Sequence, residues 1–447
     1  MDKSVRHLAV DILTLIQKRQ KFAAPLIDNC LDAYKLSGTA DGRLLTHLVY
    51  GELRFQGHLD WIIAKLYQGD FSILNEKIKN ILRIALYQLK FSERLPEFAV
   101  VDEAVKIAKK IRPAKSALVN ALLRNYLRYG KKISFPSFEK NPAEHIAAFH
   151  SHPLWLVKKW INIFGIQETL ALCAANNEIP PLTIRVNTLK TTREELKEKL
   201  VSSGLDINET TFSPDGFTLS HVDQPIQKTS FFHKGLIRIQ DEGSQCISYL
   251  VSPKENETVL DICAGTGGKT THLAAILKNK GQIIATDRDS KKISELKKET
   301  GRMGITIIAT QTADLSISLP DSLKERFDHV LVDAPCSGTG TLRRNPEIKW
   351  RIRPEDLHNY TAVQKLILGN AALAVKKGGH LIYSTCSLLP EENECIIDDF
   401  IKSNKRFSLC KPTSLIKPQL LDKHNFYHTY PQANNMDGFF GVILKSQ

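Results

Sequence analysis

The sequence predicts a multidomain protein with an all-α bundle first, a small α+β module second and a doubly wound α/β domain last. Its 447 residues are enough for two to four domains, since most domains have roughly 100 to 200 residues. Apolar residues recur with the helical period in the first third, whereas short apolar strands alternate with helical patterns after residue 257. With 42% hydrophobic and 24% charged residues, the composition excludes collagen-like, disordered and disulfide-scaffold classes.

The formal net charge of +13 is concentrated in the first third of the chain. Residues 1–150 hold 24 Lys and Arg against 15 Asp and Glu, a net charge of +9, while residues 151–250 carry −1 and residues 251–447 carry +5. A basic domain favours a polyanionic partner such as nucleic acid. Charge alone leaves a second interpretation open, a soluble helical domain with basic faces.

The first third is predicted to be entirely helical. Helical periodicity runs through residues 5–16, 78–89 and 118–127. Gly130 follows the last pattern, as the glycine at a helix C-terminus would. Residues 134–142 mix two prolines with polar residues, which indicates a linker. We therefore expect a helical domain over residues 1–135.

A small α+β module is predicted next, over residues 145–240. A helical pattern over residues 152–175 ends before two consecutive prolines. Residues 182–187 alternate in polarity as a strand does, and a charged helix is expected over residues 193–200.

The last domain, residues 241–447, is predicted to contain a mostly parallel sheet covered by helices. Continuous apolar strands separated by helical patterns are typical of such sheets. The expected strands are residues 258–262, 282–287, 306–311, 329–333 and 380–384. Ligands of open α/β sheets bind outside the carboxyl ends of the strands. Residues that follow these strands are therefore the candidates for a functional site.

The first of these strands leads into a Gly-rich turn, residues 261–271 (DICAGTGGKTT). The turn is not a P-loop, because Cys263 stands where that motif has its first glycine, and it is not a dinucleotide fingerprint, because Thr270 replaces the third glycine. Glycines at a helix N-terminus still let a ligand approach the backbone. Asp287 ends the second strand, where a carboxylate can accept hydrogen bonds from a ribose, and Asp314 follows the third. These residues favour a nucleoside-bearing cofactor over a turn that only connects a strand to a helix.

The chain has eight cysteines and no C-x-x-C pair, so neither a zinc knuckle nor a thioredoxin-like site is supported. They suit a reducing cytosol, where a cysteine is either core filler or a reactive thiolate. Cys336 and Cys386 each follow a predicted strand and have Ser or Pro rather than apolar neighbours, which favours thiol chemistry. The others are expected to pack in the interior: Cys30, Cys173, Cys246, Cys263, Cys395 and Cys410.

Several segments together resemble the RNA cytosine-C5 methyltransferases. They are residues 261–271, 333–337 (DAPCS), 344–350 (RNPEIKW), 383–387 (YSTCS) and 390–393 (PEEN). Within that group the chain is most similar to the Sun/Fmu family, whose members act on small-subunit ribosomal RNA and begin with a domain similar to the antitermination factor NusB. Residues 48–54, 101–105 and 119–124 look like recurring segments of that domain. The resemblance covers essentially the whole chain and implies a NusB-like bundle and a Rossmann-like methyltransferase domain.

The resemblance implies a reaction in which a cysteine thiolate adds to C6 of cytosine, so that C5 can accept a methyl group from S-adenosylmethionine. By resemblance, Cys386 is this nucleophile, Cys336 assists release of the adduct, and Asp333 binds the cytosine edge and favours its protonation. Lys269 would lower a thiol pKa by keeping the local potential positive. Cofactor contacts are implied for Cys263, Ala264, Gly265, Thr266, Gly267, Gly268, Lys269, Asp287, Asp314 and Asp333.

The chain departs from the family pattern at Thr266, where the usual residue is proline. Threonine keeps a backbone N–H and a freer φ, so the loop is expected to be less preorganised than with proline. Trp350 has two open interpretations, because it could stack on a base that has been flipped out or simply pack.

The implied partner is small-subunit ribosomal RNA that presents an unstacked cytosine in a loop or bulge. No metal is expected, because the 14 histidines show no H-E-x-x-H spacing. The apolar runs fall far short of the roughly 20 residues that span a bilayer, and the N-terminus does not resemble a signal peptide. We therefore expect a cytoplasmic protein with no membrane partner, and we favour a monomer.

Two alternative functions remain open. One is a DNA cytosine-C5 methyltransferase with Cys336 as nucleophile, which would leave the motif around Cys386 unexplained. The other is a non-catalytic RNA-binding or antitermination-like factor, against which the presence of both cysteines, Asp333 and Lys269 argues.

Overall fold

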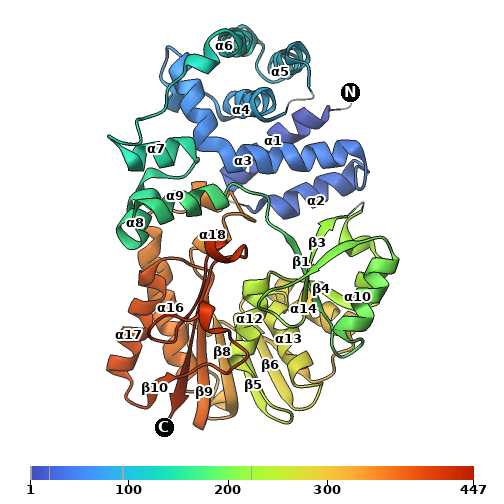
Figure 1. Cartoon of the computed structure of the whole chain (residues 1–447), viewed down its shortest axis with the longest axis vertical. Coiled ribbons are helices and arrows are strands. Elements are labelled where there is room, and N and C mark those ends of the chain that lie inside the picture. Colours follow the sequence, from blue (N-terminus) through green and yellow to red (C-terminus); the bar gives the residue numbers. More distant parts are fainter. Residues whose placement is uncertain (1–2, 20, 93–94, 223) are drawn as a thin grey trace. The chain divides into compact units, whose positions relative to one another are not determined.

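The computed structural model describes residues 3–19, 21–92, 95–222 and 224–447. The chain forms two compact units (Figure 1). Unit 1 consists of Met1–Ile179 together with the separate segment Leu342–Ile352, and unit 2 consists of Pro180–Thr341 and Arg353–Gln447. The predicted order of an all-α bundle, a small α+β module and an α/β domain is confirmed.

Unit 1 is built from helices, as the periodicity predicts. They are α1 (Val5–Arg19), α2 (Ala23–Ala33), α3 (Ala40–Leu66), α4 (Glu76–Phe91), α5 (Glu97–Ile111), α6 (Ser116–Tyr129), α7 (Pro142–Phe149), α8 (Leu154–Phe164), α9 (Ile166–Ala175) and the short α15 (Ile348–Arg351). Gly130 caps α6 at the predicted place, but its φ of −58° is right-handed and the chain continues into a 3₁₀ turn. Helices α7 to α9 belong to the compact unit 1.

The core of unit 1 forms around α4, which is buried along most of its length. Apolar residues of α1, α3, α5 and α6 pack against it, including Leu13, Leu48 and Leu123. Arg83 of α4 is also buried and makes a two-pronged pair with Asp60, through Nε–Oδ1 at 2.6 Å and Nη2–Oδ2 at 2.7 Å. Such a paired arrangement satisfies a charge that would otherwise be costly to bury.

The segment Leu342–Ile352 completes unit 1 although it lies far along the chain. Lys349 is fully buried, and its Nζ donates to the carbonyl oxygens of Arg54 at 2.8 Å and Ser151 at 3.1 Å and to Oδ1 of Asn177 at 3.0 Å. Trp350 donates its indole N–H to the carbonyl of Leu53 at 2.8 Å. The packing interpretation of Trp350 therefore describes this structure.

Unit 2 begins with a small antiparallel sheet in the order β2-β3-β1-β4. Its elements are β1 (Leu182–Val186), α10 (Arg193–Ser202), β2 (Asp206–Glu209), β3 (Gly216–His221), α11 (Ser230–His233) and β4 (Ile237–Ile239). Helix α10 starts at a capping box, in which Thr192 accepts from the backbone of Glu195 and the Glu195 side chain accepts from the backbone of Thr192.

The large sheet of unit 2 has the order β10-β12-β9-β8-β5-β6-β7, with β11 paired to β12. Its strands are β5 (Thr258–Ile262), β6 (Gln282–Asp287), β7 (Ile308–Thr312), β8 (Phe327–Asp333), β9 (Val375–Thr385), β10 (Phe407–Cys410), β11 (Tyr427–Thr429) and β12 (Phe439–Ser446). Strands β5 to β9 pair in parallel, while β10, β11 and β12 pair antiparallel. The five predicted strands are present, and the third is displaced by a residue or two.

Helices cover both faces of this sheet (Figure 1). They are α12 (Glu242–Val251), α13 (Gly268–Ile276), α14 (Ser290–Met303), α16 (Asp356–Ala372), α17 (Glu394–Ser403) and α18 (Pro431–Asn434). Apolar residues of α12 and α13 form the core on one face, and those of α16 and α17 form the core on the other. Within the described residues, no helix combines the length and apolarity needed to cross a membrane.

Candidate active site

The carboxyl ends of the parallel strands form one edge of the large sheet. The chain enters the sheet at β5, proceeds outward to β6 and β7, and then returns to place β8 on the other side of β5. The strand order therefore reverses between β5 and β8, and crevices at such a reversal are where open α/β sheets bind ligands.

A cavity of about 390 Å³ opens at this edge. The loop after β5, the ends of β6 and β8, the segment after β7 and the middle of α16 surround it. Its lining includes nine of the ten residues predicted to contact a cofactor: Cys263, Ala264, Gly265, Thr266, Gly268, Lys269, Asp287, Asp314 and Asp333. The sequence did not single out Ser244, Arg288 and Lys292, which also line it.

Gly267, the tenth predicted residue, is not among the residues that line the cavity, and it packs closely against α14. Its φ of +84° is in the left-handed region, and a Cβ at this position would lie 2.1 Å from Cδ1 of Leu296 on α14. Only glycine fits both the backbone conformation and this close approach. Cys263 is left-handed as well, with a φ of +63°, so the turn bends sharply at both ends.

Three carboxylates face the cavity with different partners. Asp287 is held by the backbone N–H groups of Gly265 and Asp289, each at 2.9 Å. Hydrogen bonds from the hydroxyl and the backbone N–H of Ser316 lower the pKa of Asp314. Asp333 pairs with Nζ of Lys269 at 2.6 Å, so the predicted cation and the predicted base-binding carboxylate are in direct contact.

The two predicted thiols are brought together. Strands β8 and β9 are parallel neighbours, with Asp333 opposite Ser384, so the loops that follow them leave the sheet side by side. The sulfur atoms of Cys336 and Cys386 lie 3.4 Å apart. The pKa of Cys336 is raised well above its usual range, first by the hydrogen bond to Cys386 and second by burial. Cys336 therefore stays a protonated thiol.

A buried carboxylate that the sequence analysis did not single out holds these two loops together. Oε1 of Glu392 accepts from the backbone N–H of Ser337 at 2.8 Å and from Nε2 of Gln364 at 3.1 Å. Its Oε2 accepts from the hydroxyls of Ser337 and Ser387, each at 2.5 Å. Ser337 follows Cys336 and Ser387 follows Cys386, so one side chain fixes the neighbours of both thiols. The PEEN motif contains Glu392, but a motif alone does not reveal these partners.

The other cysteines differ in burial. Cys173 and Cys246 are buried as predicted, whereas Cys30, Cys263 and Cys410 are half-buried. The prediction is wrong for Cys395, which is exposed. Helix α17 buries Ile396, Ile397 and Phe400, and the helical period places residue 395 on the opposite face.

Comparisons with known proteins match three successive segments of the chain to protein families. Family models match successive segments: the NusB family over residues 3–128, the ferredoxin-like domain of RsmF/B-like methyltransferases over residues 152–226, and 16S rRNA methyltransferase RsmB/F over residues 248–445. The first match covers helices α1 to α6, the second covers α8, α9 and strands β1 to β3, and the third covers the strands of the large sheet.

Similar proteins extend over the full length. The probable ribosomal RNA small subunit methyltransferase B of Bacillus subtilis strain 168 is 35% identical, with 99% of both chains covered. The ribosomal RNA small subunit methyltransferase B of Escherichia coli O6:K15:H31 is 32% identical, with 90% of both chains covered. The crystal structure of the protein PH0851 superposes over 100% of both chains with a TM-score of 0.83 and 28% identity.

Proposed function

Because this chain belongs to the ribosomal RNA small subunit methyltransferase B family of 16S rRNA methyltransferases, we propose that it methylates C5 of one cytosine through a covalent bond between Cys386 and C6. The proposed methyl donor is S-adenosylmethionine. The observation that carries the proposal is the 3.4 Å separation of the Cys336 and Cys386 sulfurs, at the sheet edge where the cavity opens.

The residues around the cavity suit a nucleoside bearing both an amino-acid group and a positive sulfur. Asp287, Asp314 and Asp333 supply negative charge, and the Gly-rich loop supplies backbone N–H groups at the start of α13. Asp287 stands at the end of β6, where a carboxylate can bind a ribose diol. When bound, S-adenosylmethionine supplies the methyl group that C5 accepts and leaves as S-adenosylhomocysteine.

The residues of the chain then have separate tasks. Sγ of Cys386 adds as a thiolate to C6, and the electron pair of the C5–C6 bond makes C5 nucleophilic while N3 takes up a proton. Asp333, paired with Lys269, accepts a hydrogen bond from the protonated edge of the base and so favours that protonation. After methyl transfer, a base removes the C5 proton, the C5–C6 double bond re-forms as the S–C6 bond breaks to release the Cys386 thiolate, and N3 gives up the proton that it had taken up. The thiol of Cys336 can donate a hydrogen bond to the departing sulfur of Cys386.

Unit 1 is proposed to hold the RNA. Helices α5 and α6 and the following turn expose a set of basic side chains: Lys106, Lys109, Lys110, Arg112, Lys115, Arg124, Arg128, Lys131 and Lys132. We call this set the α5–α6 basic face. Exposed cations of this kind attract a phosphate backbone with little sequence preference. Choice of the cytosine would then rest on contacts near the cavity.

The proposal is tested with wild type, Cys386→Ala, Cys336→Ala and Cys395→Ala, each given labelled S-adenosylmethionine and unmodified small-subunit RNA. We expect Cys386→Ala to abolish transfer, since no thiolate is left to add to C6. We expect Cys336→Ala to accumulate a protein–RNA adduct that survives denaturation, since release of Cys386 is impaired. Cys395→Ala is the control, because this cysteine is exposed on α17 and should leave both readouts unchanged.

Other outcomes would contradict the proposal in different ways. An adduct trapped by Cys386→Ala would exchange the roles of the two cysteines. Transfer to DNA but not to RNA would support the DNA methyltransferase alternative, with Cys336 as nucleophile. Absence of any transfer by the wild type, with intact RNA binding, would support a non-catalytic RNA-binding factor.

A further inference from the structure

The loop after β5 is held from outside the cavity by side chains at three consecutive carbonyl groups. The carbonyl of Gly268 accepts from Nη1 of Arg185 at 2.8 Å, and that of Gly267 accepts from Oγ1 of Thr271 at 2.7 Å. The carbonyl of Thr266 accepts from Nη2 of Arg238 at 2.9 Å. Both arginines come from the small sheet, Arg185 from β1 and Arg238 from β4. The small sheet therefore fixes the backbone of a loop that lines the cavity.

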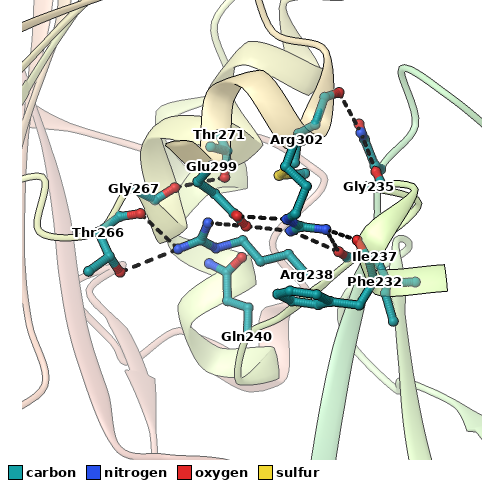
Figure 2. A network of polar contacts seen from close by, with 12 residues as sticks. Phe232, Gly235, Ile237, Arg238, Gln240, Thr266, Gly267, Thr271, Glu299 and Arg302 are labelled. Carbon is teal, nitrogen blue, oxygen red and sulfur yellow. Dashed lines mark hydrogen bonds and ion pairs between the residues drawn. The ribbon is translucent and has the colours of Figure 1, made fainter. Parts of the chain in front are cut away.

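Arg238 is itself held in place by Glu299, which in turn pairs with Arg302, as Figure 2 shows. Its Nη1 lies 2.6 Å from Oε1 of Glu299 on α14. The other oxygen of Glu299 accepts from Nε of Arg302 at 2.7 Å. Arg302 also donates to the carbonyls of Phe232 and Ile237 and stacks over the ring of Phe232, with its guanidinium carbon 3.9 Å from the ring centre. The arrangement Arg238–Glu299–Arg302 thus joins the loop, α14 and the small sheet.

Burial and charge make this arrangement rigid. The side chain of Arg238 is 11% exposed and that of Glu299 is 16% exposed. Burial raises the pKa of Glu299, but its hydrogen bond to Arg302 and the charge of Arg238 outweigh burial, so the net pKa is lowered and the carboxylate stays ionised. An ionised Glu299 that faces two guanidinium groups leaves Arg238 little freedom to turn away from Thr266.

Arg238 holds the backbone at Thr266, the residue at which the family resemblance leads us to expect proline. A proline there would restrain φ through its ring, whereas Thr266 has no such covalent restraint. Fixing the backbone of one residue costs conformational entropy, and binding of a ligand must offset this cost if the loop is not already ordered. A charged donor on the Thr266 carbonyl supplies that order before the ligand arrives. It also holds the negative end of this carbonyl toward the small sheet.

We propose that Arg238 is a positioning residue for the cofactor loop, and that its hydrogen bond to the Thr266 carbonyl, fixed through Glu299 and Arg302, replaces the restraint of a proline at residue 266. The inference rests on the proposed function, because the ligand of this loop is taken to be S-adenosylmethionine. Arg238 does not line the cavity among the described residues, so it acts on binding through the loop.

The test compares the full-length wild type with R238Q, T266P and the double variant R238Q/T266P. Calorimetry with S-adenosylmethionine gives Kd for each, and methyl transfer to small-subunit RNA gives kcat and the KM for S-adenosylmethionine. We expect R238Q to raise Kd and KM about tenfold and to leave kcat at saturating donor within about twofold. T266P should bind about as tightly as the wild type, and R238Q/T266P should bind within about threefold of T266P. A melting curve for each variant checks that it folds.

Arg193→Gln is the matched control. Arg193 also belongs to the small-sheet module, where it donates to the carbonyl of Gly216 and pairs with Glu209, away from the cofactor loop. We expect its Kd to equal that of the wild type.

Several results would overturn the inference. R238Q that binds as tightly as the wild type would exclude a positioning role, and so would a double variant as weak as R238Q. A large loss of affinity in T266P alone would show that proline does not suit this loop. A merely structural role predicts lower kcat and melting temperature without rescue by T266P. A wild type that neither binds S-adenosylmethionine nor transfers a methyl group would instead refute the proposed function.

Discussion

At the scale of single residues, Glu392 determines the geometry of the two thiols without contacting either sulfur. It accepts four hydrogen bonds, three of them from the serines that follow the cysteines. A buried carboxylate is stable only when its oxygens are saturated with donors. The same saturation makes the residue hard to replace, because each donor is buried as well.

We predict that Glu392→Ala lowers the free energy of unfolding by about 3–5 kcal/mol, because it leaves several buried donors without an acceptor. Methyl transfer should fall at least tenfold, since the loops that carry Cys336 and Cys386 lose their common anchor. Glu392→Gln, the matched control, keeps one carbonyl oxygen and the side-chain volume, and the serine hydroxyls can turn to accept from its amide. It should cost about 1 kcal/mol. Urea unfolding followed by circular dichroism measures the free energy of unfolding of both variants. Equal losses of stability in the two variants would contradict the prediction.

The catalytic candidates could be predicted from the sequence, whereas the residues that position them could not. Asp333 ends β8, and Cys336 and Cys386 follow β8 and β9, and parallel strands bring such positions to one edge. Glu392 and Arg238 act through partners that are distant in the chain, which no local pattern specifies. Arg238 contacts a loop 28 residues later, and the contact depends on how the small sheet docks on α14.

At the scale of elements, the strength of the local signal decided what could be predicted. The parallel strands β5, β6, β8 and β9 are short apolar runs and were found, with β7 displaced slightly. The sequence analysis does not predict the antiparallel strands β10 to β12, because only a 3₁₀ turn and the four-residue helix α18 separate them and no glycine-rich turn marks them. Helix α3 lies in the region predicted to be helical, but no periodic segment marks it individually, because its 27 residues bury polar side chains such as Glu52, Gln56 and His58 among the apolar ones.

The α5–α6 basic face offers a prediction at this scale. The triple variant Lys109→Gln, Lys115→Gln and Arg128→Gln should weaken binding to small-subunit RNA and reduce the slope of log K against log salt. Each lost phosphate contact accounts for roughly 0.7–0.9 of that slope. Filter binding at several salt concentrations measures it.

The control for charge removes three exposed lysines from unit 2, Lys402, Lys405 and Lys423, each changed to Gln. It alters the net charge by the same amount, so a comparable change in slope would mean that total charge, rather than the α5–α6 basic face, governs binding.

At the scale of the whole molecule, the chain returns to unit 1 with Leu342–Ile352 after forming much of unit 2. Burial and the charge of Arg54 lower the pKa of Lys349 well below its usual range, yet three oxygen acceptors surround its nitrogen. The four tryptophans of the chain, Trp61, Trp155, Trp160 and Trp350, all belong to unit 1. Tryptophan fluorescence therefore reports on this unit alone.

We predict that Lys349→Ala lowers the free energy of unfolding of unit 1 by about 3–5 kcal/mol, because it creates a cavity and removes the donor from two buried carbonyls and the part-buried Asn177 oxygen. Urea unfolding followed by tryptophan fluorescence measures the change. Lys18→Ala, an exposed lysine on α1, should change it by no more than about 0.5 kcal/mol. An unchanged midpoint for Lys349→Ala would show that the segment does not stabilise unit 1.

The late return of this segment also has a consequence for synthesis on the ribosome. Lys349 and the Arg54 carbonyl that it contacts are 295 residues apart. When residue 179 has been added, roughly 160 residues remain before Leu342, and at about 5–20 residues per second this takes about 8–30 seconds. Throughout that interval the helices of unit 1 lack the segment Leu342–Ile352, which packs among them in the complete chain. The pace of translation, rather than the intrinsic folding rate of the helices, therefore sets the earliest moment at which unit 1 can be complete.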